Sequence, residues 1–297
     1  MSEIIELPAF TDAHVHLRQG WITEAVAPYS ARVCERVIAM PNTDPPIHDA
    51  VIIEGMRTYY LGCVLPAKVH MTAKLLPRTT PADVIAAKQA GAIGFKLYPA
   101  GATTNSDDGI PEEWLCVLPD NFLRVLREMQ DQDMVLLCHG EFPSSFCLDR
   151  EREFVSFFRH TSDRFPRLRM TLEHISTHHG LSEVARLFEV YGRRVLGTIT
   201  AHHLLLTLDD VVGNKLRPDH FCKPIPKSPM DRTELKKAAT GQFTTSSCFA
   251  FGSDSAPHNS DSKYCSHGCA GVFSAPVMAQ TLVEVFEESG VPDWAWR

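Results

Sequence analysis

The feature that most constrains the fold of this chain is the alternation of short apolar runs with helix-like stretches. The apolar runs occupy residues 4–17, 32–42, 67–76, 92–99, 134–141, 167–176, 194–203 and 247–258. The expected helices lie at 22–33, 49–60, 81–90, 119–132, 149–164, 181–192, 231–240 and 275–289. Strands that alternate with helices indicate a parallel sheet. Eight such units favour a (β/α)8 TIM barrel, because an open doubly wound sheet would carry a Gly-rich turn after its first strand.

Composition excludes several classes of protein. The chain has 297 residues, of which 44% are hydrophobic, so it can bury a large core. The net charge of −7 gives no electrostatic reason to bind nucleic acid or an anionic membrane. No apolar run approaches the roughly 20 residues of a membrane helix, and the acidic start MSEIIELPAF lacks a signal-peptide pattern. The nine scattered cysteines include no CxxC pair and favour a reducing compartment. We therefore expect a soluble, cytoplasmic protein.

Polar residues follow most of the expected strands, at the end where a barrel places its chemistry. These residues are His14, His16, Asn42, Lys96, His139, His174 and Asp254. Side chains at positions i and i+2 of a strand share a face, so His14 and His16 can reach one ion. Imidazole and carboxylate groups are suitable zinc ligands. Taken singly, each histidine also fits an ordinary structural role, and it is the joint pattern that predicts a metal centre.

Lys96 is unusual because it lies within the apolar run AIGFKLYP. A buried ammonium is costly, so the side chain either reaches solvent or pairs with Asp254 or Glu141. Alternatively, burial keeps the amine neutral and lets it take up carbon dioxide as a carbamate, which has two oxygens and can bridge two metals. The ligands then divide between two ions that share Lys96, with one set of His14, His16 and Asp254 and another of His139 and His174.

The motifs DAHVHLR, PNT, GFKLYPAGATTNS, CHGE, EHIST, CKPI, GSDSAPH and GCAG occur in this order. They resemble the dihydroorotases of the amidohydrolase superfamily, in particular the single-function homodimeric type of bacteria, fungi and plants. The resemblance runs from residue 7 to about 290. HxH alone would indicate only the superfamily, whereas KLYPAGATTNS, SDSAPH and GCAG are much more specific.

The resemblance implies one catalytic (β/α)8 barrel domain over residues 1–297, as a homodimer. It implies two zinc ions per subunit, bridged by N6-carboxylated Lys96, and the reversible cyclisation of N-carbamoyl-L-aspartate to L-dihydroorotate, the third step of de novo pyrimidine (UMP) biosynthesis. The implied metal ligands are His14, His16, Lys96, His139, His174 and Asp254. A hydroxide that bridges the metals is expected to attack the cyclic amide, with Asp254 as general base and then general acid. Asp12 is expected to orient a ligand histidine.

The resemblance also implies a set of substrate-binding residues. Arg18, Asn42 and His258 would hold the substrate carboxylate, for which a guanidinium is well shaped. Thr103 and Thr104 match a mobile loop that closes over the substrate; by itself, the stretch is equally an ordinary polar loop. The backbone at Lys223 and Ala270 would face the ring. Position 223 is apolar in some relatives, which matters little if only the main chain is used.

The chain departs from the family at its end, since relatives continue past VPDWAWR with a terminal helix and strand. Two other functions stay open. One is a related cyclic amidase acting on hydantoin, dihydropyrimidine or allantoin, whose substrates lack the carboxylate. The other is a non-catalytic barrel scaffold. The remaining histidines have no implied metal role, and neither has the CSHGC segment; they are His178, His179, His202, His203 and His267.

Overall fold

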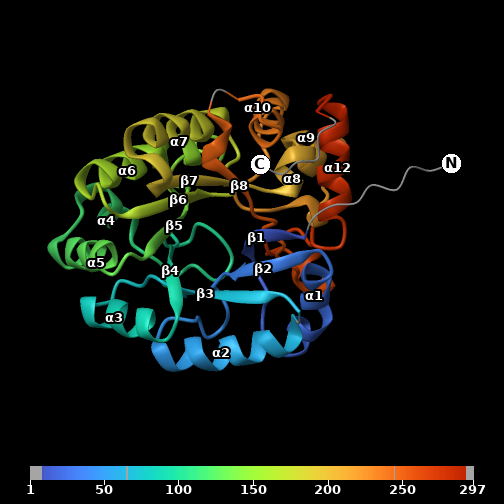
Figure 1. Ribbon diagram of the computed structural model, residues 1–297. Helices are drawn as coiled ribbons and strands as arrows, with labels where there is room; N and C mark the ends of the chain where they lie inside the picture. The colour runs from blue at the N-terminus through green and yellow to red at the C-terminus, as the bar shows by residue number, and fades with distance from the viewer. Residues whose placement is uncertain (1–8, 65, 244, 292–297) are drawn as a thin grey trace.

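The computed structural model describes residues 9–64, 66–243 and 245–291 and contains one parallel sheet of eight strands (Figure 1). The strands follow chain order from β1 to β8. They are β1 Phe10–Val15, β2 Cys34–Ala39, β3 Lys68–Lys74, β4 Ala92–Leu97, β5 Val135–His139, β6 Arg169–Glu173, β7 Val195–Ile199 and β8 Phe249–Phe251. Each expected apolar run contains one strand. Residues 4–8 of the first run lie outside the described residues.

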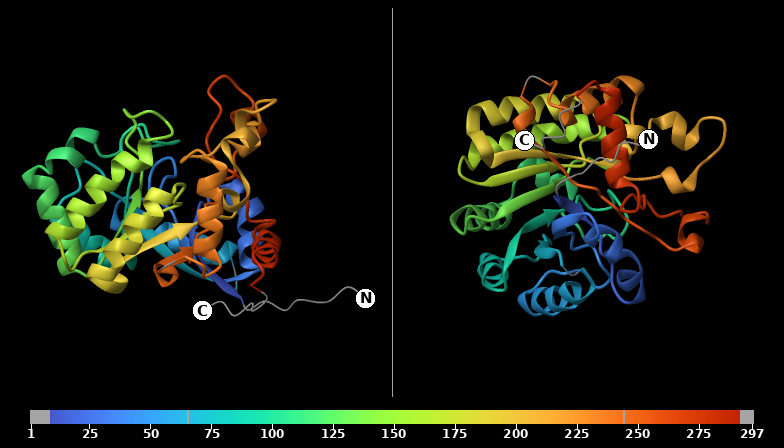
Figure 2. Two further views of the ribbon diagram at one scale, coloured as in Figure 1. Left: turned by 90° about the horizontal axis from the view of Figure 1, so that it is seen from above. Right: turned by 45° about the vertical axis from the view of Figure 1, so that its right-hand side comes forward.

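Backbone hydrogen bonds between the two ends of the sheet close it into a barrel. The amide of His16 donates to the carbonyl of Ser255 at 3.1 Å, and the amide of Asp254 donates to the carbonyl of His14 at 2.8 Å. Figure 2 shows the helices as a layer around the strands, as the TIM-barrel fold requires. This closure joins residues from opposite ends of the chain at the carboxyl ends of their strands.

The longer helices match the expected ones to within a few residues. They are α1 Trp21–Ala31, α2 Ala50–Cys63, α3 Pro81–Gln89, α5 Asp120–Asp131, α6 Arg150–Arg164, α7 His178–Tyr191, α10 Pro229–Ala239 and α12 Met278–Glu288. Local signals explain several boundaries. Thr80 and Asp83 form a capping box with Pro81 in the first turn of α3, and Ser228 and Asp231 form another at α10.

The structure adds short helical segments that the alternation pattern did not reveal. They are α4 Glu112–Val117, α8 Ala201–Leu205, α9 Leu208–Val212, α11 Ser260–Lys263 and the 3-10 turns Gly192–Arg194, Pro218–His220 and Ser246–Cys248. One of them corrects the seventh expected strand, which ends at Ile199. The hydroxyl of Thr200 accepts a hydrogen bond from the amide of His203 and starts α8, so His202 and His203 are helical.

Successive side chains along a barrel strand point alternately into the barrel and toward the surrounding helices, so site residues and core residues alternate in sequence. In β4, Phe95 and Leu97 are fully buried among the core residues, whereas Lys96 between them faces the barrel interior. Within the described residues, no helix is long and apolar enough to cross a membrane.

Gly94 provides a test of the close packing between β4 and β5. A Cβ atom added at Gly94 would meet the carbonyl oxygen of Val135 at 2.3 Å, whereas one added at Gly55 in α2 meets nothing within 4 Å. We expect Gly94→Ala to lower the free energy of unfolding by about 2 kcal/mol or more through overpacking. The matched Gly55→Ala change should raise it by about 0.5–1 kcal/mol, because alanine favours a helix. Urea unfolding of both variants measures the difference, and equal stabilities would contradict this packing.

Candidate active site

Residues from six of the eight strand ends meet in one cavity at the carboxyl end of the barrel. The cavity is lined by all of the predicted site residues except Lys96 and His258, together with Tyr98, Ala256 and Gly271. Lys96 is fully buried beneath it. The sequence pattern placed these residues at strand ends, and the closed barrel brings the ends together.

His14 in β1, His16 just after β1 and an aspartate after β8 converge on one point. The Nε2 atoms of His14 and His16 lie 3.3 Å apart. Oδ1 of Asp254 lies 3.3 Å from the first and 3.1 Å from the second. Zinc binds imidazole at about 2.0–2.1 Å, so corners of its tetrahedron are about 3.3 Å apart. The three ligand atoms therefore have the spacing of three corners around one ion.

A second pair of imidazoles comes from neighbouring strands. His139 ends β5, and His174 follows β6; Nδ1 of the first lies 3.1 Å from Nε2 of the second. Burial lowers the pKa of both imidazoles, which keeps them neutral and able to bind a metal. Nε2 of His139 also lies 3.0 Å from the carboxylate of Glu141, which can fix the orientation of the ring.

Lys96 contacts a carboxylate that the sequence analysis missed. Its Nζ donates to Oε2 of Glu173 in β6, where Asp254 or Glu141 had been considered as the partner. Both side chains are fully buried. The charge of Lys96 works to lower the pKa of His14, His139 and His174, which belong to both groups of ligands. A signal for Glu173 was present, since it immediately precedes His174 in the EHIS motif.

The electrostatics of the site favour a bound cation. Burial works to lower the pKa of His14, but the carboxylates of Glu173 and Asp254 outweigh it and raise the value to about 9. The Nδ1 atom of His14 lies 3.0 Å from Glu173. Burial lowers the pKa of His16 to about 4, and contacts with His14 and His16 hold the pKa of Asp254 well below its usual range despite burial. Glu173 and Asp254 thus hold a proton on His14, and a divalent cation bound at the cluster would take the place of that positive charge.

Three functional positions have backbone conformations that non-glycine residues rarely adopt. The φ angles are +64° at Arg18, +43° at His174 and +43° at Asp254. Such conformations cost on the order of 1–3 kcal/mol each and persist only where the surrounding structure imposes them. Each angle turns a side chain toward the cavity at the end of its strand.

The carboxylate-binding residues predicted from the resemblance are in contact with one another. The Nε of Arg18 donates to the carbonyl of Pro257 at 2.9 Å, and its terminal nitrogen lies 2.9 Å from Nε2 of His258. The same nitrogen of His258 lies 3.0 Å from the carbonyl of Ala270. Burial, with Arg18 nearby, lowers the pKa of His258 to about 3, so the ring is neutral. The positive charge on this side of the cavity therefore comes from Arg18.

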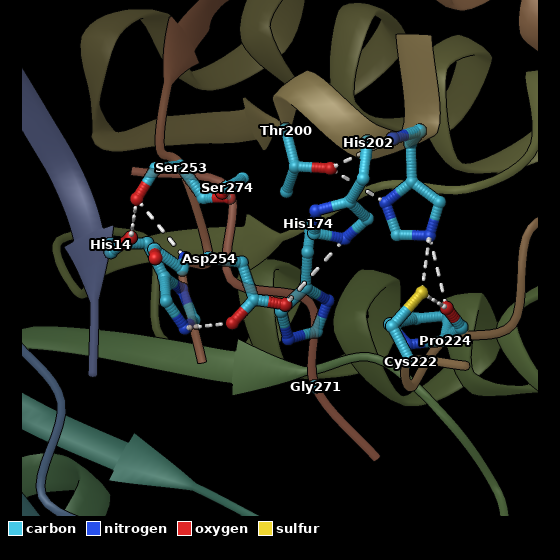
Figure 3. A network of polar contacts seen from close by, with 12 residues as sticks. His14, His174, Thr200, His202, Cys222, Pro224, Ser253, Asp254, Gly271 and Ser274 are labelled. Carbon is cyan, nitrogen blue, oxygen red and sulfur yellow. Dashed lines mark hydrogen bonds and ion pairs between the residues drawn. The ribbon is translucent and has the colours of Figure 1, made fainter. Parts of the chain in front are cut away.

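Asp12 supports the site through the backbone rather than through an imidazole ring. Its carboxylate accepts from the amides of His14 at 3.1 Å and Ser253 at 2.8 Å, and from the hydroxyl of Ser253 at 2.6 Å. These bonds join β1 to the segment that carries Asp254; Figure 3 shows Ser253 and Asp254 of that segment beside His14. The carboxylate that contacts Nδ1 of the His14 ring is Glu173.

His202, His203 and Cys222 form another buried group whose ligand-type atoms lie within 4.8 Å of one another. Both ring nitrogens of His203 already have partners, Thr200 Oγ1 at 2.8 Å and the carbonyl of Pro224 at 2.9 Å (Figure 3). Because that carbonyl can only accept, Nε2 carries the proton and cannot bind a metal. Nε2 of His202 lies 4.0 Å from the carboxylate of Asp254, but His202 does not line the cavity.

The other histidines without an implied role lie apart from the cavity lining. His178 starts α7, and its Nδ1 lies 3.0 Å from Asp231. His179 follows it and is exposed, and His267 contacts the neighbouring Ser266. Within the described residues, neither Cys265 nor Cys269 belongs to a potential metal-binding group, so the CSHGC segment forms no third centre there.

Comparisons with known proteins are consistent with this geometry. No protein-family model matches the chain. The dihydroorotase of Helicobacter hepaticus is 37% identical over 287 residues, which cover 96% of this chain and 80% of the relative. The dihydroorotase of Neisseria gonorrhoeae is 38% identical over 288 residues and is also covered to 80%, by 95% of this chain.

Solved structures give the same result. Dihydroorotase from Saccharomyces cerevisiae, in complex with 5-fluoroorotic acid, superposes with a TM-score of 0.89 and 32% identity, over 98% of this chain and 81% of that one. An L-hydantoinase from Arthrobacter aurescens superposes with a TM-score of 0.77 at 16% identity, over 96% of this chain and 67% of that one. This second likeness concerns the fold alone.

Glu151 of α6 holds the segment that follows His174. Its buried carboxylate accepts four hydrogen bonds, from the amides of Ser176 and Thr177 at 2.7 and 3.0 Å and from their hydroxyls at 2.6 and 2.5 Å. We expect Glu151→Gln to lower the free energy of unfolding by about 2 kcal/mol, because the new amide group faces donors. The exposed Glu153→Gln change in the same helix is the control. Chemical denaturation measures both, and equal stability would contradict this role.

Proposed function

The chain belongs to the dihydroorotase family, and we propose that its cavity interconverts N-carbamoyl-L-aspartate and L-dihydroorotate at a centre of two zinc ions. It is thus a hydrolase of a cyclic amide, in the third step of pyrimidine synthesis. The observation that carries the proposal is that a metal-type ligand set and Arg18, which contacts His258, line one cavity. A reaction that closes a carbamoyl nitrogen onto a carboxylate needs both the metal ions and the carboxylate-binding pair.

The metal ligands proposed are the six residues predicted from the sequence. His14, His16 and Asp254 would hold one ion, and His139 and His174 the other. Lys96 would bridge the two as an N6-carboxylated lysine, which requires its amine to leave Glu173 and take up carbon dioxide. Metal ions bound there would polarise the amide carbonyl and make a water nucleophile available at neutral pH.

Asp254 is the proposed general base and acid. Its carboxylate is ionised because neighbouring imidazoles hold its pKa low despite burial, and its Oδ1 already faces the metal-type cluster. During ring opening it would accept a proton at a carboxylate oxygen from the attacking water and deliver it to the leaving amide nitrogen. During cyclisation the same proton moves in reverse.

Substrate recognition is assigned to residues on two sides of the cavity. Arg18 would form charge-assisted hydrogen bonds with the substrate carboxylate, and Asn42 and His258 would complete that subsite. Thr103 and Thr104 line the cavity from the loop after β4, and Lys223 and Ala270, whose backbone is proposed to face the ring, also line it. These main-chain groups would bind the polar edge of the ring and orient it toward Asp254.

The carboxylate subsite distinguishes this function from the cyclic amidases. Hydantoin and dihydropyrimidine carry no carboxylate, so a guanidinium held against His258 at 2.9 Å would be an uncompensated charge beside them. A scaffold without activity would have no need of so many converging, buried ligand groups. We also propose that the described barrel is the single catalytic domain of a cytoplasmic homodimer; the cysteines of the chain, all free, are consistent with a reducing compartment.

Metal analysis with activity measurements tests the proposed centre. We expect about two zinc ions per chain after supply of zinc and bicarbonate, and hydrolysis of dihydroorotate that a chelator abolishes. Lys96→Ala should lose nearly all activity, since the bridge between the ions is gone. Retained activity in this variant would rule out the bridging role, whereas a metal-free, inactive wild-type protein would favour the scaffold.

Arg18→Ala tests the carboxylate subsite. We expect a fall in kcat/KM for dihydroorotate of at least about a hundredfold, equivalent to roughly 2.7 kcal/mol of lost binding to the transition state. Activity on dihydrouracil, which lacks the carboxylate, should not fall in the same way. The exposed Arg167→Ala is the control. If Arg18→Ala kept full activity on dihydroorotate, the cyclic-amidase alternative would become the better proposal.

A further inference from the structure

Lys74 is a buried lysine whose position the proposed reaction does not explain. It is the last residue of β3 and is only 1% exposed. β3 contributes no metal ligand or substrate group to the proposed site. A buried ammonium is costly unless it has close hydrogen-bonding or charged partners. The identity of those partners therefore indicates what Lys74 does.

Both hydrogen-bonding partners of Lys74 Nζ in the described part of the chain belong to one loop, residues 100–109. Nζ donates to the carbonyl of Asn105 at 2.7 Å and forms an ion pair with the carboxylate of Asp108. The ring of Tyr98, which precedes the loop, lies 5.8 Å away and adds a cation–π contact.

This loop is built as a unit with a narrow base. Its two ends are joined by backbone hydrogen bonds, from Ala100 to Ile110 at 2.9 Å and from Ile110 to Tyr98 at 2.8 Å. Within the loop, the hydroxyl of Ser106 donates to the carbonyl of Thr103 at 2.6 Å and accepts from its amide at 2.9 Å. A change at the base would therefore move Thr103 and Thr104 together.

The loop crosses the mouth of the barrel. It follows β4, yet the hydroxyl of Thr104 accepts a hydrogen bond from the amide of Ala270, beyond β8, at 3.1 Å. Strands β4 and β8 lie on opposite sides of a closed barrel whose strands follow chain order. On the way, the side-chain amide of Asn42 donates to the carbonyl of Thr104 at 3.4 Å. Thr103 and Thr104 therefore lie over the cavity.

The contacts of Thr104 and those of Lys74 should respond differently when substrate binds. Asn42 and Ala270 are proposed substrate-binding groups, so their hydrogen bonds to Thr104 must be exchanged when substrate enters. The contacts of Lys74 lie outside that exchange, because neither Asn105 nor Asp108 lines the cavity. Lys74 is therefore an attachment between loop and barrel that substrate binding need not break, beside the bond from the side-chain amide of Asn105 to the carbonyl of Asn42 at 3.3 Å.

We propose that Lys74 is a positioning residue that holds the loop of residues 100–109 across the site and thereby sets the affinity for substrate. Lifting the loop would remove Asn105 and Asp108 from a buried ammonium, which disfavours the open arrangement. The inference rests on the proposed function for its effect on substrate, but the attachment itself can be measured without catalysis.

Lys74→Met, which keeps the length of the side chain and removes its charge, tests the attachment. In metal-free protein we expect hydrogen exchange at residues 103–108 to become about tenfold faster. In zinc-loaded enzyme we expect KM for dihydroorotate to rise about tenfold while kcat changes by less than about threefold. Lys74→Arg should recover part of both effects. Lys88→Met, on the exposed face of α3, is the matched control and should change neither.

Asp108→Asn is the second variant, because Lys74→Met could fail to fold. It leaves Lys74 in place, weakens only the ion pair, and should give a smaller increase in loop exchange and KM. The proposal is overturned if loop exchange and KM are unchanged in Asp108→Asn and in a folded Lys74→Met. If loop exchange rises but wild-type enzyme does not act on dihydroorotate, the proposed function fails while the attachment by Lys74 stands.

Discussion

The closure of the barrel between its first and last strands is the constraint on which the site depends. Two backbone hydrogen bonds, His16 to Ser255 and Asp254 to His14, align the ends of β1 and β8. Asp12 strengthens the junction, since it binds the amides of both His14 and Ser253. Because of this junction, the carboxylate of Asp254 contacts the imidazoles of His14 and His16, from which nearly the whole chain separates it in sequence. Without the closure there would be no metal-type cluster.

Around that junction the protein maintains an unusual density of buried charge. Glu173 contacts both Lys96 and His14, and Asp254 contacts His14 and His16. Buried ions are stable only when each has partners, and here the carboxylates of Glu173 and Asp254 each contact an imidazole or an ammonium. A divalent cation would satisfy the same carboxylates more completely. The arrangement is therefore consistent with a metal centre. Lys96 pairs with Glu173 in this structure and, as proposed, would bridge two ions once it is carboxylated.

Sequence patterns predicted the fold well because its signals are local. Apolar runs, proline at the start of α3 and the capping box at Thr80 are readable over a few residues, and each long helix was expected close to its observed bounds. The short helices between strands and site were not expected, since they have too few turns to show a period. His202 illustrates the consequence. It was expected at a strand end, yet it lies in α8, 4.0 Å from Asp254.

The sequence by itself determined which chemical groups stand at the ends of the strands, because strand periodicity and motif order are properties of the chain. It also determined the family, because specific motifs such as KLYPAGATTNS carry that information. Only the tertiary structure decided which groups touch. The partner of Lys96 is Glu173, and the partners of Lys74 are Asn105 and Asp108. Both choices depend on the register between strands and on a loop that crosses the barrel. Such contacts join residues far apart in the chain, and no local pattern records them.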